Sequence, residues 1–93
     1  MDGRTHKLKT WPEFFQYVWT GLKKFELRQD DRAYRAGDIL LLQEWTIQNG
    51  YTGREIEARV TYLMSGIGLQ QNYVVMSIDI LSRKPVDSQE GGV

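Results

Sequence analysis

The chain has 93 residues, of which 41% are hydrophobic and 26% are charged, and it contains no cysteine. This composition is typical of a globular domain, and the length suits one domain with a thin hydrophobic core. The lack of cysteine excludes disulfides and thiolate chemistry, and the balance of 12 basic against 12 acidic residues excludes a strongly basic nucleic-acid-binding domain. No apolar run approaches the roughly 20 residues that cross a bilayer, so we expect a cytoplasmic protein without a membrane partner.

The charges are unevenly distributed along the chain. Residues 1–35 carry eight basic and five acidic side chains, and the remainder carries four basic and seven acidic ones. Such an asymmetry permits one positive face on the folded domain, although ordinary solvated charge gives the same count.

A short strand at residues 6–10 is expected to precede a helix. Thr10 and Glu13 have the spacing of a capping box, Pro12 is tolerated in a first helical turn, and Gly21 supplies the stop. An apolar stripe follows one helix face at spacings of three and four, formed by Trp11, Phe14, Phe15, Val18 and Trp19. In a small domain this stripe indicates core packing against a sheet, with Trp11 or Trp19 at its edge, more than a platform for stacking bases.

Residues 24–28 alternate between polar and apolar side chains, which predicts a strand. Phe25 and Leu27 share one face of this strand, and Glu26 and Arg28 share the other. Two residues on one strand face are about 7 Å apart, so Glu26 and Arg28 can bracket a ligand or pair with each other. Lys23 can approach them from the corner between helix and strand.

Further strands are expected at residues 39–45, 56–63 and 73–81, with a hairpin connection at 48–53 and a glycine-containing loop at 64–72. The loop is either a plain connector or a flexible segment that closes over a site. Its glycines lack the Lys-Ser/Thr of a phosphate-binding loop, so no cofactor is predicted, and the single histidine and absent cysteines favour no metal site.

These elements predict an α+β fold. A chain this short, with strands this hydrophobic, is most easily completed as a small mixed β-barrel of about five strands, with the N-terminal helix packed over the barrel. We expect one domain at residues 6–81, between a flexible N-terminus at 1–5 and a disordered tail at 82–93.

Several dispersed motifs carry a resemblance to a known family. The spacing G-x-K-x-x-E-x-R at Gly21, Lys23, Glu26 and Arg28, followed by a Gly-Asp turn at residues 37–38 and a hydrophobic strand, resembles the ASCH domain of the PUA-like superfamily. The subgroup that it resembles is a small, single-domain bacterial and phage set of undefined function. That subgroup shares H-x-L-K-x-W-P at 6–12, GDIL-x-L-x-E-W at 37–45, Y-T-G-R-E at 51–55 and G-x-G-L…Y-V-V at 66–75.

The resemblance implies a PUA-like barrel with a cleft between helix and barrel that the motif residues line. RNA binding is the function usually proposed for the family. A small bacterial branch instead hydrolyses the amide of N-acetylcytidine with the motif lysine, a threonine nucleophile and a later glutamate. Lys23 matches that lysine, but Glu26 occupies the place of the threonine, and residues 64–81 contain no glutamate.

Three functions therefore stay open. In the favoured one, the domain binds RNA or a small nucleotide-like ligand: Lys23 and Arg28 meet phosphate and Glu26 accepts from a base amino group. Further ligand-binding candidates are Trp11, Tyr34 and Trp45, which could stack a base, and His6, which is either a donor in the cleft or simply solvated.

The alternatives differ in what the charged motif does. In an amidohydrolase acting on a modified nucleoside, Lys23 and Glu26 would be the catalytic residues. In a structural or partner-binding domain, Lys23, Glu26 and Arg28 would only form a network of ion pairs on a strand face.

Overall fold

The computed structural model describes residues 3–86, and these form one helix and five strands. In chain order the elements are β1 (Thr5–Thr10), α1 (Pro12–Trp19), β2 (Phe25–Gln29), β3 (Ile39–Thr46), β4 (Gly50–Ser65) and β5 (Tyr73–Lys84). Within this part of the chain, no helix has the length and apolar character needed to cross a membrane.

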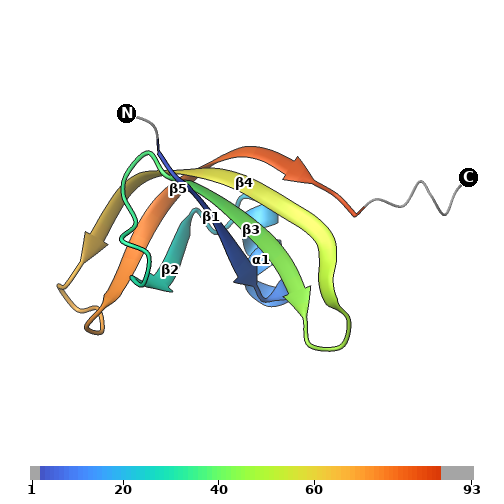
Figure 1. Ribbon diagram of the computed structural model, residues 1–93, viewed down its shortest axis with the longest axis horizontal. Coiled ribbons are helices and arrows are strands. Elements are labelled where there is room, and N and C mark those ends of the chain that lie inside the picture. The colour runs from blue at the N-terminus through green and yellow to red at the C-terminus, as the bar shows by residue number, and fades with distance from the viewer. Residues whose placement is uncertain (1–2, 87–93) are drawn as a thin grey trace, which may run out of the picture.

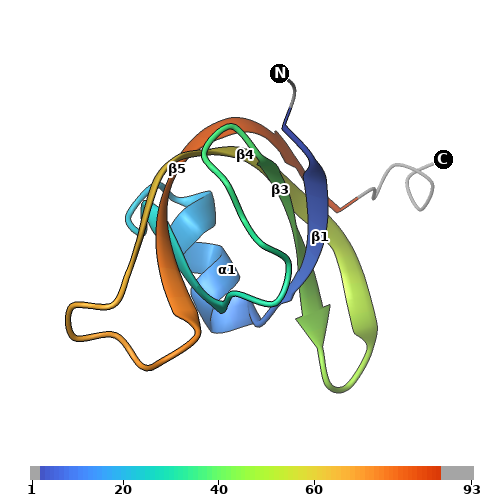
Figure 2. The same cartoon turned by 60° about the vertical axis from the view of Figure 1, so that its left-hand side comes forward.

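The strands form a single mixed sheet in the order β1-β3-β4-β5-β2. β1 runs parallel to β3, and the other three neighbouring pairs are antiparallel. The sheet curls into an arch, and α1 lies in the hollow of this arch (Figures 1 and 2). The predicted α+β class, the mixed sheet and the covering helix are confirmed, but the sheet is a half-barrel, because β1 and β2 are its two edges rather than a hydrogen-bonded pair.

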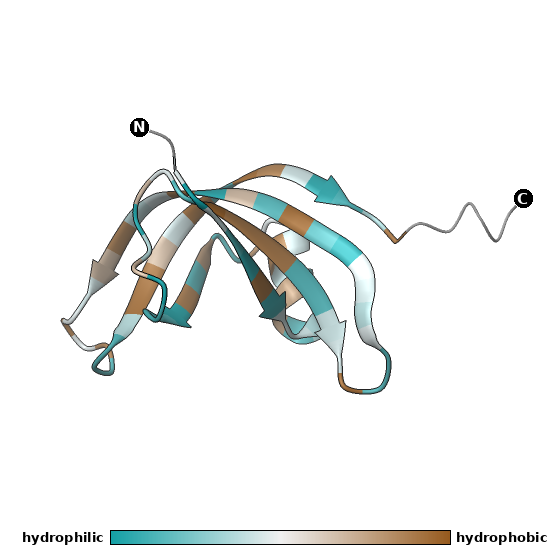
Figure 3. Ribbon diagram, viewed as in Figure 1, coloured by the Kyte–Doolittle hydropathy of each residue, from teal (hydrophilic) through white to brown (hydrophobic). Residues whose placement is uncertain are grey.

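The core fills the space between α1 and the concave face of the sheet. Hydrophobic and hydrophilic residues alternate along much of the strands, apart from continuous runs such as Ile39–Leu42 in β3 and Val74–Met76 in β5 (Figure 3). This alternation turns every second residue inward, where it meets Phe15 and Val18 of the helix. The other buried hydrophobic residues are Leu8, Tyr34, Leu40, Leu42, Ile56, Ala58, Val60, Val74, Met76 and Ile78.

β4 is longer and less regular than its sequence predicts. Its pairing with β5 shifts register between Glu57 and Ala58 and again between Val60 and Tyr62. After the second shift Tyr62 is 65% exposed and Leu63 packs on the core, although uninterrupted alternation along residues 56–63 would place Tyr62 on the same face as Val60. Such bulges add one residue to a strand and therefore exchange its two faces.

The start of α1 differs from the predicted capping box. The residue before the helix is Trp11, and no side chain caps the free N–H groups there. The Thr10 hydroxyl donates instead to the carbonyl of Leu8 at 3.0 Å. The predicted end of the helix at Gly21 is confirmed, because Gly21 follows α1 with a φ of 86°, a conformation that glycine adopts at low cost.

The ends of the domain are more ordered than the sequence predicts. β1 begins at Thr5, and Gly3 packs so closely on the backbone of Gly37 that an added Cβ would lie 2.0 Å from the Gly37 oxygen. At the other end β5 continues to Lys84, so Ser82–Lys84 belong to the sheet rather than to a tail. Residues 1–2 and 87–93, which the predicted flexible ends include, lie outside the described residues.

Asp38 joins β1 to the loop that precedes β3. Its side chain is buried, and it accepts hydrogen bonds from the backbone N–H groups of Arg4 and Arg35 at 3.1 and 3.0 Å. His6 contacts the same carboxylate at 2.9 Å, so the expectation that His6 is solvated is wrong. Burial raises the pKa of Asp38, but the hydrogen bonds from His6, Arg4 and Arg35 outweigh burial and hold the pKa at about 2.

This arrangement predicts an acid-sensitive stability. The folded pKa of about 2 lies below the ordinary value of 3.8, so Asp38 stabilises the fold above pH 4 and loses that contribution as the pH falls toward 2. A shift of this size is equivalent to about 2 kcal/mol. The free energy of unfolding of the wild type is expected to approach that of Asp38→Asn by about this amount between pH 5 and pH 2, measured by urea denaturation. Asp79→Asn, which alters an exposed carboxylate, is the control; a constant difference between Asp38→Asn and the wild type would contradict the assignment.

Candidate functional site

The two edges of the half-barrel, β1 and β2, face each other across a seam. Edge strands leave backbone groups unpaired, and arginine side chains satisfy several of those on β1. Arg28 of β2 donates to the carbonyl of Lys9 at 3.2 Å and to the hydroxyl of Thr10 at 3.1 Å. Arg32, in the loop after β2, donates to the carbonyl of Lys7 at 3.0 Å. Side chains therefore close the seam where a complete barrel would have a backbone ladder.

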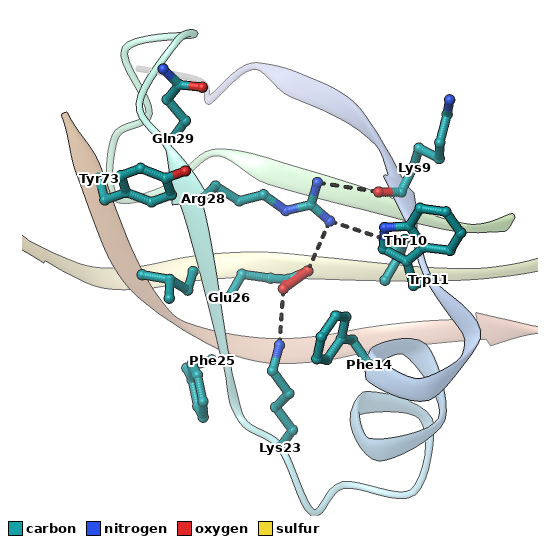
Figure 4. A pocket seen from close by; sticks show the side chains of 11 residues that line it. Lys9, Thr10, Trp11, Phe14, Lys23, Phe25, Glu26, Arg28, Gln29 and Tyr73 are labelled. Atoms are coloured by element: carbon teal, nitrogen blue, oxygen red, sulfur yellow. Dashed lines mark hydrogen bonds and ion pairs between the residues drawn. The ribbon is translucent and has the colours of Figure 1, made fainter. Parts of the chain in front are cut away.

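A pocket of about 440 Å³ opens in this seam, between the end of β1, the start of α1 and β2 (Figure 4). Its volume falls within the range of small-molecule sites in proteins. The lining residues are Lys9, Thr10, Trp11, Phe14, Lys23, Phe25, Glu26, Leu27, Arg28, Gln29 and Tyr73.

Glu26 lies at the centre of the pocket lining, and two cations hold it. Lys23 Nζ donates to Oε1 at 3.0 Å, and an Arg28 terminal nitrogen donates to Oε2 at 3.3 Å (Figure 4). Glu26 is only 3% exposed, whereas the Lys23 and Arg28 side chains are 17% and 24% exposed. The carboxylate is thus fixed by charge-assisted hydrogen bonds, and the two cations have partial access to solvent.

The polar face of β2 is the face that turns into the hollow. Glu26 is opposite Met76 of β5, which is fully buried, so both side chains lie on the concave side of the sheet. The apolar residues Phe25 and Leu27 on the other face are 44% and 48% exposed. β2 is therefore inverted relative to an ordinary edge strand, and its buried charge is matched by Lys23 and Arg28 instead of by water.

Aromatic rings form much of the pocket wall. Trp11 and Phe14 are 46% and 48% exposed, although they belong to the helix stripe whose other members enter the core. Trp45 lies behind Trp11 with its ring edge-on at a centroid distance of 5.3 Å, and Lys9 Nζ lies 4.3 Å from the Trp45 ring. Half-exposed rings fixed from behind are suited to contact the face of a planar ligand.

A second ion pair fixes the helix against the sheet. Arg54 of β4 donates to both oxygens of Glu44 at 3.0 Å, and its guanidinium stacks 4.9 Å from the Phe15 ring and 4.7 Å from the Trp19 ring. The hydrogen bond from Arg54 lowers the pKa of Glu44 despite its burial. Because Gln16 also accepts from Arg54 at 2.9 Å, the orientation of α1, and with it the Trp11 wall, depends on this contact.

The structure brings some of the sequence-predicted site residues together and separates others. Lys23, Glu26, Arg28 and Trp11 line the pocket, and Trp45 supports it without lining it. Tyr34 and His6 lie elsewhere.

Tyr34 belongs to the loop that follows β2 and is buried, which raises the pKa of its hydroxyl. Its ring packs edge-on against His6 at 4.8 Å, and both residues belong to the arrangement around Asp38. Neither residue lines this pocket, so the assignment of His6 to the cleft is corrected, whereas Tyr34 lines a smaller pocket of about 150 Å³ beside it.

Seven lining residues were missed by sequence reasoning: Lys9, Thr10, Phe14, Phe25, Leu27, Gln29 and Tyr73. Thr10 was assigned to a helix cap, whereas its hydroxyl accepts from Arg28 inside the pocket. The H-x-L-K-x-W-P segment at 6–12 could have indicated Lys9 and Thr10 as lining residues, because both directly precede the predicted site residue Trp11. Among residues 3–86, no group of three or more His, Asp or Glu side chains is arranged to hold a metal ion.

Comparison with known families gives a match across most of the chain. The family model described as a domain of unknown function, DUF3850, matches residues 5–78. The chain belongs to this family. The matched segment of the DUF3850 domain contains every residue that lines the pocket.

A similar protein is the "Uncharacterized 12.9 kDa protein in GpA 3'region" of Escherichia phage P2. It is 37% identical over 76 residues, which is 82% of this chain and 69% of the phage protein. The likeness therefore covers most of the chain rather than one short motif.

The geometry predicts a structural cost for removing the central charge. In Glu26→Gln, the amide can accept from one cation only, and its NH₂ group faces the other. We expect the free energy of unfolding to fall by about 2 kcal/mol, which is less than for a fully buried pair because Lys23 and Arg28 can turn toward water. Urea denaturation measures the change. The matched control is Glu13→Gln, an exposed residue in the first turn of α1 with an expected effect of a few tenths of a kcal/mol; equal losses in the two variants would refute the central role of Glu26.

Proposed function

We propose that this DUF3850 domain is a PUA-like module that binds a nucleoside or nucleotide, free or as part of RNA, in the seam pocket. The observation that carries the proposal is the buried carboxylate of Glu26, held between Lys23 and Arg28 in a pocket with aromatic walls. The curled mixed sheet with a helix in its hollow supports the PUA-like assignment, because the residues of the G-x-K-x-x-E-x-R motif lie between helix and sheet.

Glu26 has the capacity to read a base. A carboxylate has about four lone-pair sites, and Lys23 and Arg28 each occupy one. The remaining sites can accept from amino or ring N–H groups of a nucleobase, whose Watson–Crick edge is the part usually recognised in single-stranded RNA. Fixed by two cations, Glu26 cannot turn away from such a ligand without breaking both hydrogen bonds.

The surrounding residues suit the other parts of a nucleotide. Trp11 and Phe14 offer half-exposed ring faces, and a base stacked on an aromatic ring gains about 1–3 kcal/mol. Lys9, Lys23 and Arg28 place three positive charges against the single negative charge of Glu26, so the pocket has a net positive charge that favours phosphate.

The same geometry gives less support to the amidohydrolase. The two residues that would be catalytic there, Lys23 and Glu26, are hydrogen-bonded to each other at 3.0 Å rather than directed at a water or a substrate group. The Thr10 hydroxyl, which also lines the pocket, donates to a backbone carbonyl and accepts from Arg28, an arrangement without a general base. A purely structural ion-pair network fits less well too, because a solvated strand face would leave Glu26 exposed and would have no pocket beside it.

The proposal predicts ligand-dependent stabilisation. A nucleoside, nucleotide or short RNA present at 100 times its Kd should stabilise the fold by about 2.7 kcal/mol, which a thermal-shift screen detects as a higher melting temperature. If no member of such a panel raises the melting temperature at millimolar concentration, the proposed function is wrong.

Two variants test whether binding occurs in the seam pocket. Trp11→Ala and Lys23→Ala should each weaken affinity for the stabilising ligand at least about tenfold, since each removes a stacking or charged contact. The matched controls are Tyr17→Ala, an exposed aromatic of α1 outside the pocket, and Lys7→Ala, an exposed lysine of β1. Unchanged affinity in both pocket variants would place the binding site elsewhere.

A further inference from the structure

Two smaller pockets adjoin the seam pocket at opposite ends of β2. One, of about 150 Å³, shares Arg28 and Gln29 with the seam pocket and includes Arg32 and Asp31. The other, of about 250 Å³, shares Lys23 with it and includes Lys24 and Arg83 near the end of α1. Each smaller pocket thus shares lining residues with the seam pocket, one pocket toward each end of β2, and we call the three pockets together the track.

This track concentrates positive charge in a chain whose net charge is zero. Its lining contains six basic and three acidic side chains, a net charge of +3. One of the acids, Glu26, is buried between Lys23 and Arg28, whereas these two cations have partial access to solvent. Lys24 is exposed, and no hydrogen bond or ion pair involving its side chain occurs within residues 3–86.

We infer that the track binds a single strand of nucleic acid, with one nucleotide in the seam pocket and the phosphates on either side of it in the two flanking pockets. The inference rests on the proposed function and adds to it, because a free nucleotide would fill the seam pocket alone. Cations at both ends of a base-sized pocket match a polyanion that passes through the site, whereas a mononucleotide carries phosphate on one side only.

The length of the track agrees with a short strand. β2 spans five residues, about 13 Å at a rise of about 3.3 Å per residue. Stacked nucleotides rise by about 3.4 Å each along one strand, so this length corresponds to about three or four nucleotides.

The direct test is affinity as a function of length. Fluorescence anisotropy or competition with mononucleotides and with RNA and DNA oligonucleotides of two to eight nucleotides should show affinity rising at least about tenfold up to three or four nucleotides and then levelling. The logarithm of the association constant should fall with the logarithm of salt concentration with a slope of about −1.4, as expected for the two phosphate contacts of the flanking pockets to a single strand. Comparing the affinities for RNA and DNA oligonucleotides of the same sequence shows which of the two nucleic acids the track prefers.

Variants of the flanking pockets separate this inference from the proposed function. Lys24→Ala and Arg32→Ala should each reduce the salt slope by about 0.7 and weaken tetranucleotide binding about three- to tenfold, with no effect on mononucleotide binding. Arg59→Ala, which removes an exposed arginine of β4 outside the track, should change neither. Because Arg32 also donates to the β1 backbone, Lys24→Ala is the cleaner variant, and its melting temperature should equal that of the wild type.

The possible results are distinguishable. If mononucleotides bind as tightly as tetranucleotides, the inference of a single-strand track is wrong and the proposed function stands. If neither binds, the inference and the proposed function are both wrong. Equal binding of a poly-glutamate peptide of the same charge would also overturn the inference, since it would show a general attraction for polyanions.

Discussion

The buried carboxylate of Glu26 is the constraint on which the half-barrel and its pocket depend. A charge at 3% exposure is tolerable only with partners, and Lys23 and Arg28 supply them from either end of β2. Arg28 also donates to the Lys9 carbonyl and the Thr10 hydroxyl, so the group that neutralises Glu26 is the same group that holds the two sheet edges together. Charge pairing and closure of the fold are therefore one interaction, and the pocket is the space left where side chains take the place of a backbone ladder.

The rest of the molecule fixes the two walls of that space. On one side, Arg54 contacts Glu44 of the sheet and the Phe15 and Trp19 rings of α1, and so fixes the helix against the sheet. Trp11 directly precedes this helix and is positioned with it. On the other, the hydrogen bonds to Asp38 hold the beginning of β1 beside β3. A binding site gains from such support, because side chains that are already ordered lose less entropy when a ligand arrives.

Much of the fold could be predicted from local patterns. The helix stop at Gly21, the alternation from Phe25 to Arg28 and the strand that begins at Ile39 depend on neighbours in the sequence, and all are present. The bulges of β4 could not be predicted, because an extra residue in a strand is decided by pairing with β5 and leaves no trace in the local pattern.

The site shows the same division between local and tertiary information. Alternation assigns Glu26 and Arg28 to one face of β2 but does not say which face turns inward, and here the polar one does. The roles of His6 and Tyr34 depend on Asp38, which lies 32 residues from His6 in the sequence, so spacing alone could not separate them from the cleft.

The indole N–H signals of the tryptophans test most directly whether a ligand binds in the seam pocket. Trp11 lines this pocket, whereas Trp19 does not. In a ¹⁵N-labelled sample titrated with a stabilising mononucleotide, the account predicts that the Trp11 signal shifts strongly and the Trp45 signal, from the ring behind it, shifts less. Trp19, stacked on Phe15 and Arg54 outside the pocket lining, should stay unchanged. A shift confined to Trp19, or saturation of binding without any change at Trp11, would contradict the assignment of the seam pocket as the binding site.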